Sequence, residues 1–509
     1  MPQDPSRPAR AGKREWIGLA VIALPCLLYS MDLTVLNLAV PAISAELKPS
    51  SAQMLWIVDI YGFFVAGSLI TMGTLGDRIG RRKLLMIGAT AFGLASVLAA
   101  FSTSAGMLIA ARAVLGVAGA TLAPSTLSLI RNMFLDPRQR TVAIGVWIAS
   151  FSVGGAIGPL LGGLVLAHFW WGAAFLLAVP VMVLLLVLGP YLLPEFRDPD
   201  AGRLDLPSAA LSVAAVLSVI YGMKRIAEDG LQWPPAIAIF AGLALGVLFV
   251  RRQRTLVDPL IDLALFRVPA FSAALAINTL GFFAMFAAFL YIGQYLQLVL
   301  GMGPMEAGLW TVPSALAFLA GSFIAPALGH RIHPALMMAG GLALAAVGFG
   351  VLSQLGTSSG LATLITGSVI FSLGLTPVVT MTTDLIVGSA PPERAGAASA
   401  ISETSSEFGG ALGIAVLGSV AAAIYRSEMA NTLPAGLPAA ATEAARGTIG
   451  SAAAVAAQLP GALGAPLLDA ARNAFVHGLQ ASAAISAAVV IAAAIVAVAK
   501  LRRVGTDGP

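Results

Sequence analysis

Apolar runs of about 20 residues recur fourteen times along the chain, and they constrain its fold more than any other feature. A bilayer core is roughly 30 Å thick, and about 20 helical residues are needed to cross it. Hydrophobic residues make up 58% of the sequence and charged residues only 10%, far from the composition of a soluble globular chain. The sequence therefore predicts an all-α polytopic membrane protein with fourteen transmembrane helices. The predicted spans are residues 15–41, 53–75, 84–102, 107–130, 141–166, 171–193, 207–224, 234–250, 270–295, 307–328, 334–353, 360–386, 397–424 and 475–499.

Positive charge is distributed unevenly between the two sets of loops. Most of the 29 Lys and Arg residues precede the first span, follow the last one, or lie in every second loop between them. By the positive-inside rule, this asymmetry predicts a multi-pass protein of the cell (inner or plasma) membrane with both termini in the cytoplasm. The same distribution accounts for the formal net charge of +5, so no nucleic-acid partner is expected.

Cysteine and histidine usage gives no sign of a metalloprotein or an enzyme. The single cysteine, Cys26, lies in the first span, so no intramolecular disulfide is expected. The four histidines suggest no metal-ligand cluster, and no set of nucleophile and base is visible. We therefore expect no cofactor, no metal and no enzymatic activity, and we expect a monomer.

Asp32 stands inside the first apolar run. Ionisable residues within spans are costly, face the protein interior and usually mark a function. Arg112, inside the fourth span, needs a carboxylate nearby, and Asp32 is its expected partner. A carboxyl group in such surroundings can exchange a proton for a cation, so we expect Asp32 to bind both in turn, with Arg112 tuning it. The alternative is that Asp32 only joins helices by bonding to Thr34 or Arg112.

Further acids are candidates for the same chemistry. Glu403 and Glu407 lie four residues apart, so they share one helix face and repel each other when both are ionised. We expect both to take part in proton coupling and substrate binding, the alternative being a solvated vestibule. Asp59, near the outer end of the second span, is expected to contact substrate unless it is a surface acid. Asp384, close to an inner helix end, is interpreted as a solvated acid.

Aromatic side chains would complete a site for lipophilic cations, because cations are attracted to ring faces. The candidates are Tyr61 in the second span and Phe286, Tyr291 and Tyr295 in the ninth. For each of them the alternative is packing within the bundle or a place in an interfacial belt.

Two glycine-bearing segments predict structural roles. The segment Gly73, Asp77, Arg78, Gly80 and Arg81 is interpreted as a conformational latch. Its glycines permit a tight turn, and Asp77 is expected at the start of the third helix, where the helix dipole favours an acid. In the fifth span, small residues let a neighbouring helix approach closely, and a proline bends the helix. The residues of this packing motif are Gly154, Gly158, Pro159, Gly162 and Gly163.

An internal repeat predicts the domain organisation. Residues 75–79 return in similar form at 328–332, and residues 154–158 return at 409–413. The two matches are separated by nearly the same number of residues, which predicts two equivalent six-helix bundles with the seventh and eighth spans inserted between them. The loop 425–473 of the second bundle is expected to form a short helical or hairpin cap on the outer side. The expected division is a cytoplasmic tail (1–14), a first bundle (15–193), linkers with the inserted pair (194–268), a second bundle (269–499) and a cytoplasmic tail (500–509).

Five segments carry a resemblance to a known family. Residues 73–83 resemble the loop signature of the major facilitator superfamily, and residues 154–163 resemble the helix-five motif of its drug:proton antiporters. Residues 32–41 and 108–116 are similar to the helix-one and helix-four motifs of the fourteen-helix branch. Residues 53–61, together with Glu403 and Glu407, look most like the quaternary-ammonium efflux pumps of that branch.

The resemblance covers nearly the whole chain and implies the major facilitator fold. It also implies proton-driven export of lipophilic cationic drugs, antiseptics and dyes by alternating access. An exporter of an endogenous metabolite or lipid-like compound, and a sensor or scaffold that does not transport, stay open as alternatives. Two departures matter: His330 replaces Asp77 in the second half, which predicts a one-sided latch, and the tenth span lacks an interior acid, which predicts weaker handling of dications.

Overall fold

The computed structural model describes residues 10–49, 51–197, 205–229, 232–256, 259–328, 332–357, 360–434 and 437–502. Within these ranges all regular structure is helical, and thirteen segments are long and apolar enough to cross a membrane. The all-α membrane fold is therefore confirmed. The helices are α1 (Lys13–Leu47), α2 (Ser51–Ile79), α3 (Arg81–Ala100), α4 (Ala105–Met133), α5 (Pro137–His168), α6 (Ala173–Leu176), α7 (Ala178–Leu192), α8 (Leu206–Asp229), α9 (Trp233–Gln253), η1 (Leu265–Arg267), α10 (Pro269–Gln294), η2 (Tyr295–Val299), α11 (Pro304–Ser322), α12 (Ile324–Leu328), α13 (Pro334–Leu352), α14 (Gly360–Gly388), η3 (Pro392–Arg394), α15 (Ala395–Thr432), α16 (Ala439–Gly447), α17 (Ile449–Ala456) and α18 (Gly461–Leu501).

Two of the predicted spans are interrupted. The run 171–193 folds as α6 and α7, and the run 307–328 folds as α11 and α12, which is the predicted span missing from the thirteen. Each interruption lies three residues before a proline, Pro180 or Pro326. Proline has no backbone N–H, so the carbonyl four residues earlier loses its helical partner and the helix is weakened there.

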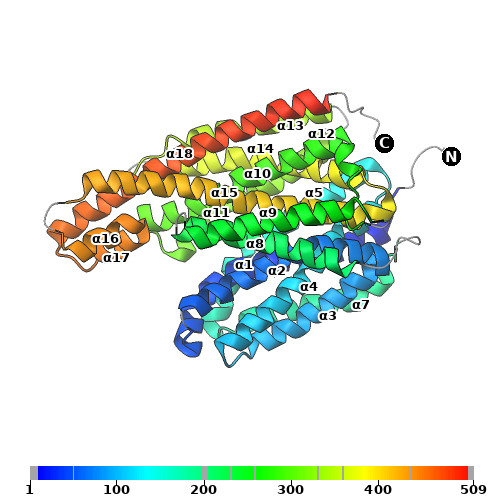
Figure 1. Ribbon diagram of the computed structural model, residues 1–509, viewed down its shortest axis with the longest axis horizontal. Helices are drawn as coiled ribbons and strands as arrows, with labels where there is room; N and C mark the ends of the chain where they lie inside the picture. The colour runs from blue at the N-terminus through cyan, green and yellow to red at the C-terminus, as the bar shows by residue number, and fades with distance from the viewer. Residues whose placement is uncertain are drawn as a thin grey trace.

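The helices form two groups joined side by side. Among the first-half helices, α1 packs on α5, and α4 packs on α2 and α3. Among the second-half helices, α10 packs on α15 and α18, and α14 packs on α11 and α13. The hairpin of α8 and α9 attaches through α8 to α2 and α15. The start of α1 and the end of α18 lie at the same end of the molecule, called the termini end below (Figure 1).

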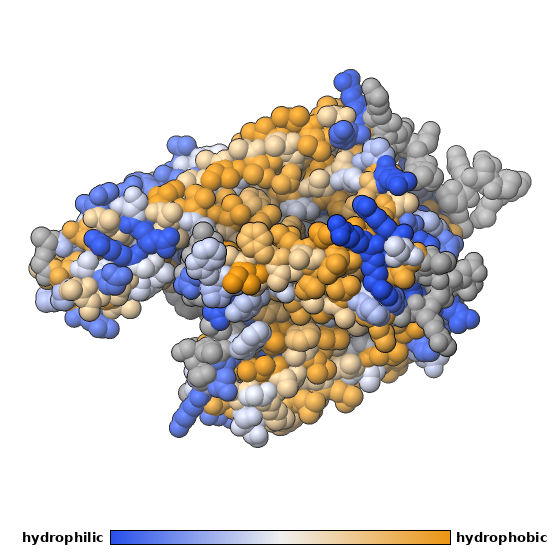
Figure 2. All heavy atoms as spheres, in the orientation of Figure 1, coloured by the Kyte–Doolittle hydropathy of each residue, from blue (hydrophilic) through white to orange (hydrophobic). Residues whose placement is uncertain are grey.

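The opposite end carries a projecting lobe. There α15 and α18 extend beyond their predicted spans, and α16 and α17 lie between them (Figure 1). The hydroxyl of Tyr425 on α15 donates a 2.9 Å hydrogen bond to the carbonyl of Ala445 and so ties the lobe together. The described residues of 425–473 are thus mostly helical. Figure 2 shows a hydrophobic band across the middle of the molecule, with hydrophilic atoms gathered at the termini end and on the lobe.

Helix α5 approaches α1 closely along its glycine motif. A Cβ atom at Gly154 would collide with the backbone carbonyl of Leu27, and one at Gly162 would lie 2.9 Å from a Val35 methyl group. Gly158 is buried between them, whereas a Cβ at Gly163 would lie 3.9 Å from the methyl group of Met305 on α11. The helix continues through Pro159, whose side chain lies outside the described part of the structure. Small residues thus allow the backbones of α1 and α5 to touch.

Replacing Gly154 by Ala is expected to destabilise the protein by about 1–3 kcal/mol, because α1 and α5 must separate to admit the methyl group. Thermal unfolding of the purified protein in detergent measures the effect. Gly340→Ala in α13 is the matched control, since a Cβ there has nothing within 4 Å. Equal stability of the two variants would contradict the close contact.

Candidate functional site

Asp32 of α1 and Arg112 of α4 face each other inside the first-half helices. Arg112 Nη1 lies 3.4 Å from Asp32 Oδ2, with exposed side-chain fractions of 0% for Arg112 and 16% for Asp32. The guanidinium also lies over the ring of Tyr61, 5.4 Å from its centroid. The Nε of Arg112 and the hydroxyl of Tyr61 have no hydrogen-bond partner among the described residues. The expected pairing is therefore present, but the pair is long and leaves polar atoms unsatisfied, so it can change partners.

A small cavity adjoins the carboxylate. It holds about 20 Å³ and is lined by Asp32 together with apolar side chains of α1, α3, α6 and α7, among them Phe92 and Phe175. A cavity of this size holds about one water molecule. Asp32 thus lies between a cation and a space large enough for a proton-carrying water.

Glu407 is linked across the two groups of helices. The hydroxyl of Tyr29 on α1 donates a 3.0 Å hydrogen bond to Glu407 Oε1 on α15. The Tyr29 ring packs against Tyr61 and Phe151, with centroid distances of 5.9 Å and 5.8 Å. One ring therefore connects the surroundings of the Asp32–Arg112 pair to Glu407. Glu403 lies one turn earlier on α15 and is partly exposed.

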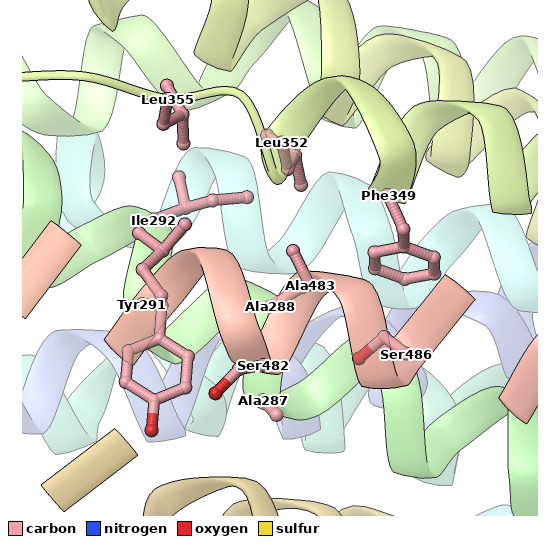
Figure 3. Close-up of a pocket in the computed structure, with 11 residues that line it drawn as sticks. Ala287, Ala288, Tyr291, Ile292, Phe349, Leu352, Leu355, Ser482, Ala483 and Ser486 are labelled. Carbon is pink, nitrogen blue, oxygen red and sulfur yellow. The ribbon is translucent and has the colours of Figure 1, made fainter. Parts of the chain in front are cut away.

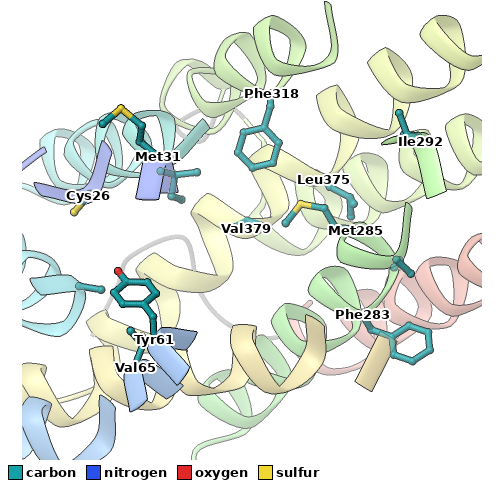
Figure 4. Close-up of a cluster of buried hydrophobic side chains, with 14 of the residues drawn as sticks. Cys26, Met31, Tyr61, Val65, Phe283, Met285, Ile292, Phe318, Leu375 and Val379 are labelled. Carbon is teal, nitrogen blue, oxygen red and sulfur yellow. The ribbon is translucent and has the colours of Figure 1, made fainter. Parts of the chain in front are cut away.

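Buried apolar side chains of both groups of helices form one cluster. Figure 4 shows Met31 and Tyr61 on one side and Phe318, Leu375 and Val379 on the other. Sequence reasoning missed Tyr29, Trp147 and Phe151, although Tyr29 lies three residues before Asp32 and so near it on the same helix. Trp147 packs on Phe151 at 4.7 Å and donates a 2.9 Å hydrogen bond to Thr126.

The other predicted aromatic residues, Phe286, Tyr291 and Tyr295, pack elsewhere than against the Asp32–Arg112 pair. Phe286 packs against Gly410 and Phe282. The hydroxyl of Tyr291 donates to the carbonyl of Leu417 at 3.2 Å, and that of Tyr295 donates to the carbonyl of Gly356 at 2.6 Å. Tyr291 borders a cavity of about 20 Å³ among α10, α13 and α18, with Ser482 and Ser486 nearby (Figure 3).

Both tyrosines are thus held by backbone carbonyls of the second half, Tyr291 by α15 and Tyr295 by the loop after α13. Asp59 is half-buried on α2, next to Val58, whose carbonyl accepts a 3.5 Å hydrogen bond from Arg112. The substrate contacts of these residues stay predictions.

Asp77 joins the two groups of helices at the termini end, and its expected place at the start of α3 is wrong. It lies in the last turn of α2, and its carboxylate accepts hydrogen bonds from the amides of Gly396 (3.0 Å) and Ala397 (2.9 Å). The positive end of the α15 dipole, not that of α3, therefore stabilises the acid. Gly73 lies at the same contact, where a Cβ atom would be 2.5 Å from the carbonyl of Gly396.

Arg81 completes the contact through η3, which directly precedes α15. Its side chain is fully buried, and its Nε donates to Asp77 at 2.8 Å. Its Nη2 donates to the carbonyls of Pro392 and Glu393 at 2.7 and 3.0 Å. Gly80 has a φ of +108°, a conformation that favours glycine and turns the chain so that Arg81 returns toward Asp77. Arg78, which lies between Asp77 and Gly80 in the sequence, is half-buried.

A second tie at this end had not been anticipated. Arg140 of α5 donates to Asp384 of α14 at 2.6 Å, and Thr141 donates to the same carboxylate at 2.7 Å. Asp384 is therefore bonded across the two groups, and its interpretation as a merely solvated acid is wrong. His330 lies outside the described residues, so the one-sided latch stays a prediction.

Replacing Asp77 by Asn is expected to open the termini end, because charge-assisted hydrogen bonds worth about 1–3 kcal/mol are lost. Spin labels at Lys83 and Arg267, in a Cys26→Ser background, report the distance between the two groups. The population of long distances should rise in the variant. Asp136→Asn is the matched control, since among the described residues the Asp136 carboxylate bonds within its own helix, to the amides of Arg138 and Gln139. The same rise in both variants would contradict a latch at Asp77.

Comparison with known proteins gives a consistent set of matches. The family model described as Major Facilitator Superfamily matches residues 22–414. The chain is 45% identical over 494 residues to the multidrug efflux pump LfrA of Mycolicibacterium smegmatis, covering 97% of this chain and 98% of the relative. It is 36% identical over 484 residues to the methyl viologen resistance protein SmvA of Salmonella typhimurium, covering 92% and 95%. The crystal structure of the human organic anion transporter TETRAN superposes with a TM-score of 0.61 at 15% identity, covering 95% and 99%, which bears on the fold alone.

Proposed function

The chain belongs to the major facilitator superfamily, and we propose that it is a proton-coupled antiporter that exports lipophilic cations by alternating access. The proposed substrates are cationic drugs, antiseptics and dyes, including quaternary ammonium compounds. The protein would act as a monomer in the inner or plasma membrane with both termini in the cytoplasm. The similarity to a multidrug efflux pump and to a methyl viologen resistance protein supports export of drugs.

One observation carries the proposal: a carboxylate of each half is linked to the same pair of packed tyrosine rings, Tyr29 and Tyr61. Asp32 and Arg112 lie in the first half, and Glu407 of the second half is bonded to Tyr29, whose ring adjoins Tyr61. Two features favour binding of a lipophilic cation here: apolar walls contact its body, and a carboxylate pairs with its charge. The rings of Tyr29, Tyr61 and Phe151 add faces that attract a cation.

Proton exchange follows from the same arrangement. When Asp32 is ionised it balances Arg112, and when it takes up a proton the buried Arg112 charge is left uncompensated and repels a bound cation. Protonation from the outside thus favours release of the drug there. Deprotonation toward the cytoplasm restores attraction for the next cation. Glu403 and Glu407 act as the second-half counterpart, and the Tyr29–Glu407 bond makes the contact between the halves depend on the state of Glu407.

The two polar contacts at the termini end, Asp77 with α15 and Arg140 with Asp384, would control alternating access. With Asp77 on the first turn of α15 and Arg140 on Asp384, the two groups of helices are joined at that end. Breaking both ties would let the two groups rock about the site. This is the motion that parallel-repeat transporters use to expose a midplane site to each side in turn.

Ethidium efflux from cells tests the proposal. Cells that produce the wild-type protein should extrude ethidium faster than cells without it, and a protonophore should abolish the difference. Efflux that persists with the protonophore would contradict proton coupling. Export of a neutral or anionic compound, with no export of ethidium or methyl viologen, would favour the metabolite exporter instead.

A further inference from the structure

An open groove lies between the inserted hairpin of α8 and α9 and the helices α2 and α15. Its volume is about 600 Å³, within the range of ligand pockets. Its walls come from α8, α9, one residue of α2 and two of α15, and they are mostly apolar. Leu243 and Val247 of α9 are each 53% exposed along it, and α9 packs mainly on α8. The groove therefore opens sideways, toward the lipid.

Two arginines stand at the end of the groove nearest the termini. Arg251 and Arg254 both line it, and three residues apart they share a helix face. Both side chains are exposed, and neither side chain forms a hydrogen bond or ion pair in the described ranges. Hydrophilic atoms gather at this end of α9 in Figure 2.

Arg252, between them, is held differently. It pairs with Asp205 through bonds of 2.7 and 2.9 Å, and these bonds hold the pKa of the Asp205 carboxyl well below its usual range. Asp205 thus neutralises one arginine of the three and leaves two positive charges at the mouth of the groove.

The interior of the groove offers little to a polar ligand. Ser212 directs its hydroxyl to the carbonyl of Ala209, and Thr404 contributes one hydroxyl without a partner in the described residues. From Gly242 to Arg254 the groove follows α9 for about 18 Å at 1.5 Å per residue, slightly more than half of a roughly 30 Å bilayer core. An occupant thus needs an apolar body of about one leaflet's depth and an anionic group at one end.

We propose that this groove binds one anionic phospholipid of the leaflet at the termini end, with an acyl chain along α9 and its phosphate between Arg251 and Arg254. Basic side chains at the membrane surface attract anionic headgroups. The lipid would lie on α15 through Thr404 and Phe408, next in sequence to the two glutamates of the candidate site. It would thus support the helix that carries them.

Native mass spectrometry of the full-length protein in detergent tests this assignment, with dioleoyl phosphatidylglycerol and dioleoyl phosphatidylcholine as probes. The wild type should bind the first phosphatidylglycerol more tightly. Arg251→Gln with Arg254→Gln should weaken that binding by about 5-fold for each arginine, and leave phosphatidylcholine unchanged. Arg197→Gln with Arg267→Gln is the control of equal charge, at exposed residues that do not line the groove, and it should bind as the wild type does.

A second variant tests the apolar part. Gly246 lines the groove, and a Cβ there has nothing within 4 Å, so Gly246→Trp places an indole in the groove. Both lipids should bind more weakly to it. The assignment is overturned if the control pair loses as much phosphatidylglycerol affinity as the Arg251 and Arg254 pair, or if the Trp variant binds both lipids normally. It is also overturned if inorganic phosphate displaces phosphatidylglycerol. Displacement by ethidium would overturn it too, and would make the groove a route for the exported cation.

Discussion

Asp32→Asn is expected to abolish proton-driven export and leave only background efflux. Asn keeps the shape of the side chain but cannot take up or release a proton. It also leaves the fully buried Arg112 without its carboxylate, 3.4 Å away in the native pair, so an uncompensated charge repels cations at all times. The measurement is ethidium uptake into proteoliposomes under an imposed pH gradient, which the wild type should drive and the variant should not.

Folding must be separated from coupling in this variant, because breaking a buried pair can destabilise a protein by about 3–5 kcal/mol. Exchange of labelled for unlabelled cation at equal pH needs no net proton movement, so it measures cation transport separately from proton coupling. Asp32→Glu, which keeps the charge, is the matched control and should retain part of the driven uptake. If Asp32→Asn pumps at the wild-type rate, or if Asp32→Glu is as inactive as a misfolded chain, the role assigned to Asp32 is wrong.

Glu407→Gln is expected to weaken binding of monovalent organic cations by roughly tenfold, about 1.4 kcal/mol, since one attractive charge is removed from an apolar interior. Gln still accepts the hydrogen bond from Tyr29, so the contact between α1 and α15 should persist. Glu403→Gln should act in the same direction. Tryptophan quenching by a titrated cationic dye, with purified protein, gives the apparent dissociation constants.

The charge of the ligand separates binding from folding here. A neutral compound that the protein transports should be affected much less than a cation by Glu403→Gln and Glu407→Gln. Glu428→Gln is the matched control, because Glu428 lies on the same helix but pairs with His477 at 3.4 Å near the lobe. Equal losses for neutral and cationic compounds would indicate damage to α15 and not the loss of a charge.

The helices and one buried pair were predictable because they depend on local chemistry. Runs of about 20 apolar residues must cross a bilayer as helices, whatever their neighbours are. Arg112 inside such a run needs a carboxylate, and Asp32 was available in a span of the same half. The breaks before Pro180 and Pro326 were not predicted, because both runs were expected as continuous spans and α4 and α14 continue through Pro124 and Pro377.

The contacts between the halves could not be predicted, because they depend on how two groups of helices dock. Tyr29 and Glu407 are 378 residues apart, and Arg140 and Asp384 are 244 apart. No periodicity or local motif relates such positions. Asp77 shows the same limit. It was expected next to the start of a helix, and it does lie there. The helix, however, is α15, whose Gly396 is 319 residues away, and not α3, the next helix in the chain.

Cation-induced proton release tests the central claim most directly. Purified protein in weakly buffered detergent solution, near the pH at which it transports, is mixed with tetraphenylphosphonium while a pH dye reports free protons. An antiporter whose carboxylates bind either a proton or the cation must release protons as the cation binds. Wild-type protein should therefore acidify the solution in proportion to occupancy, and Asp32→Asn should release fewer protons. Saturable cation binding with no proton release from the wild type would contradict the account.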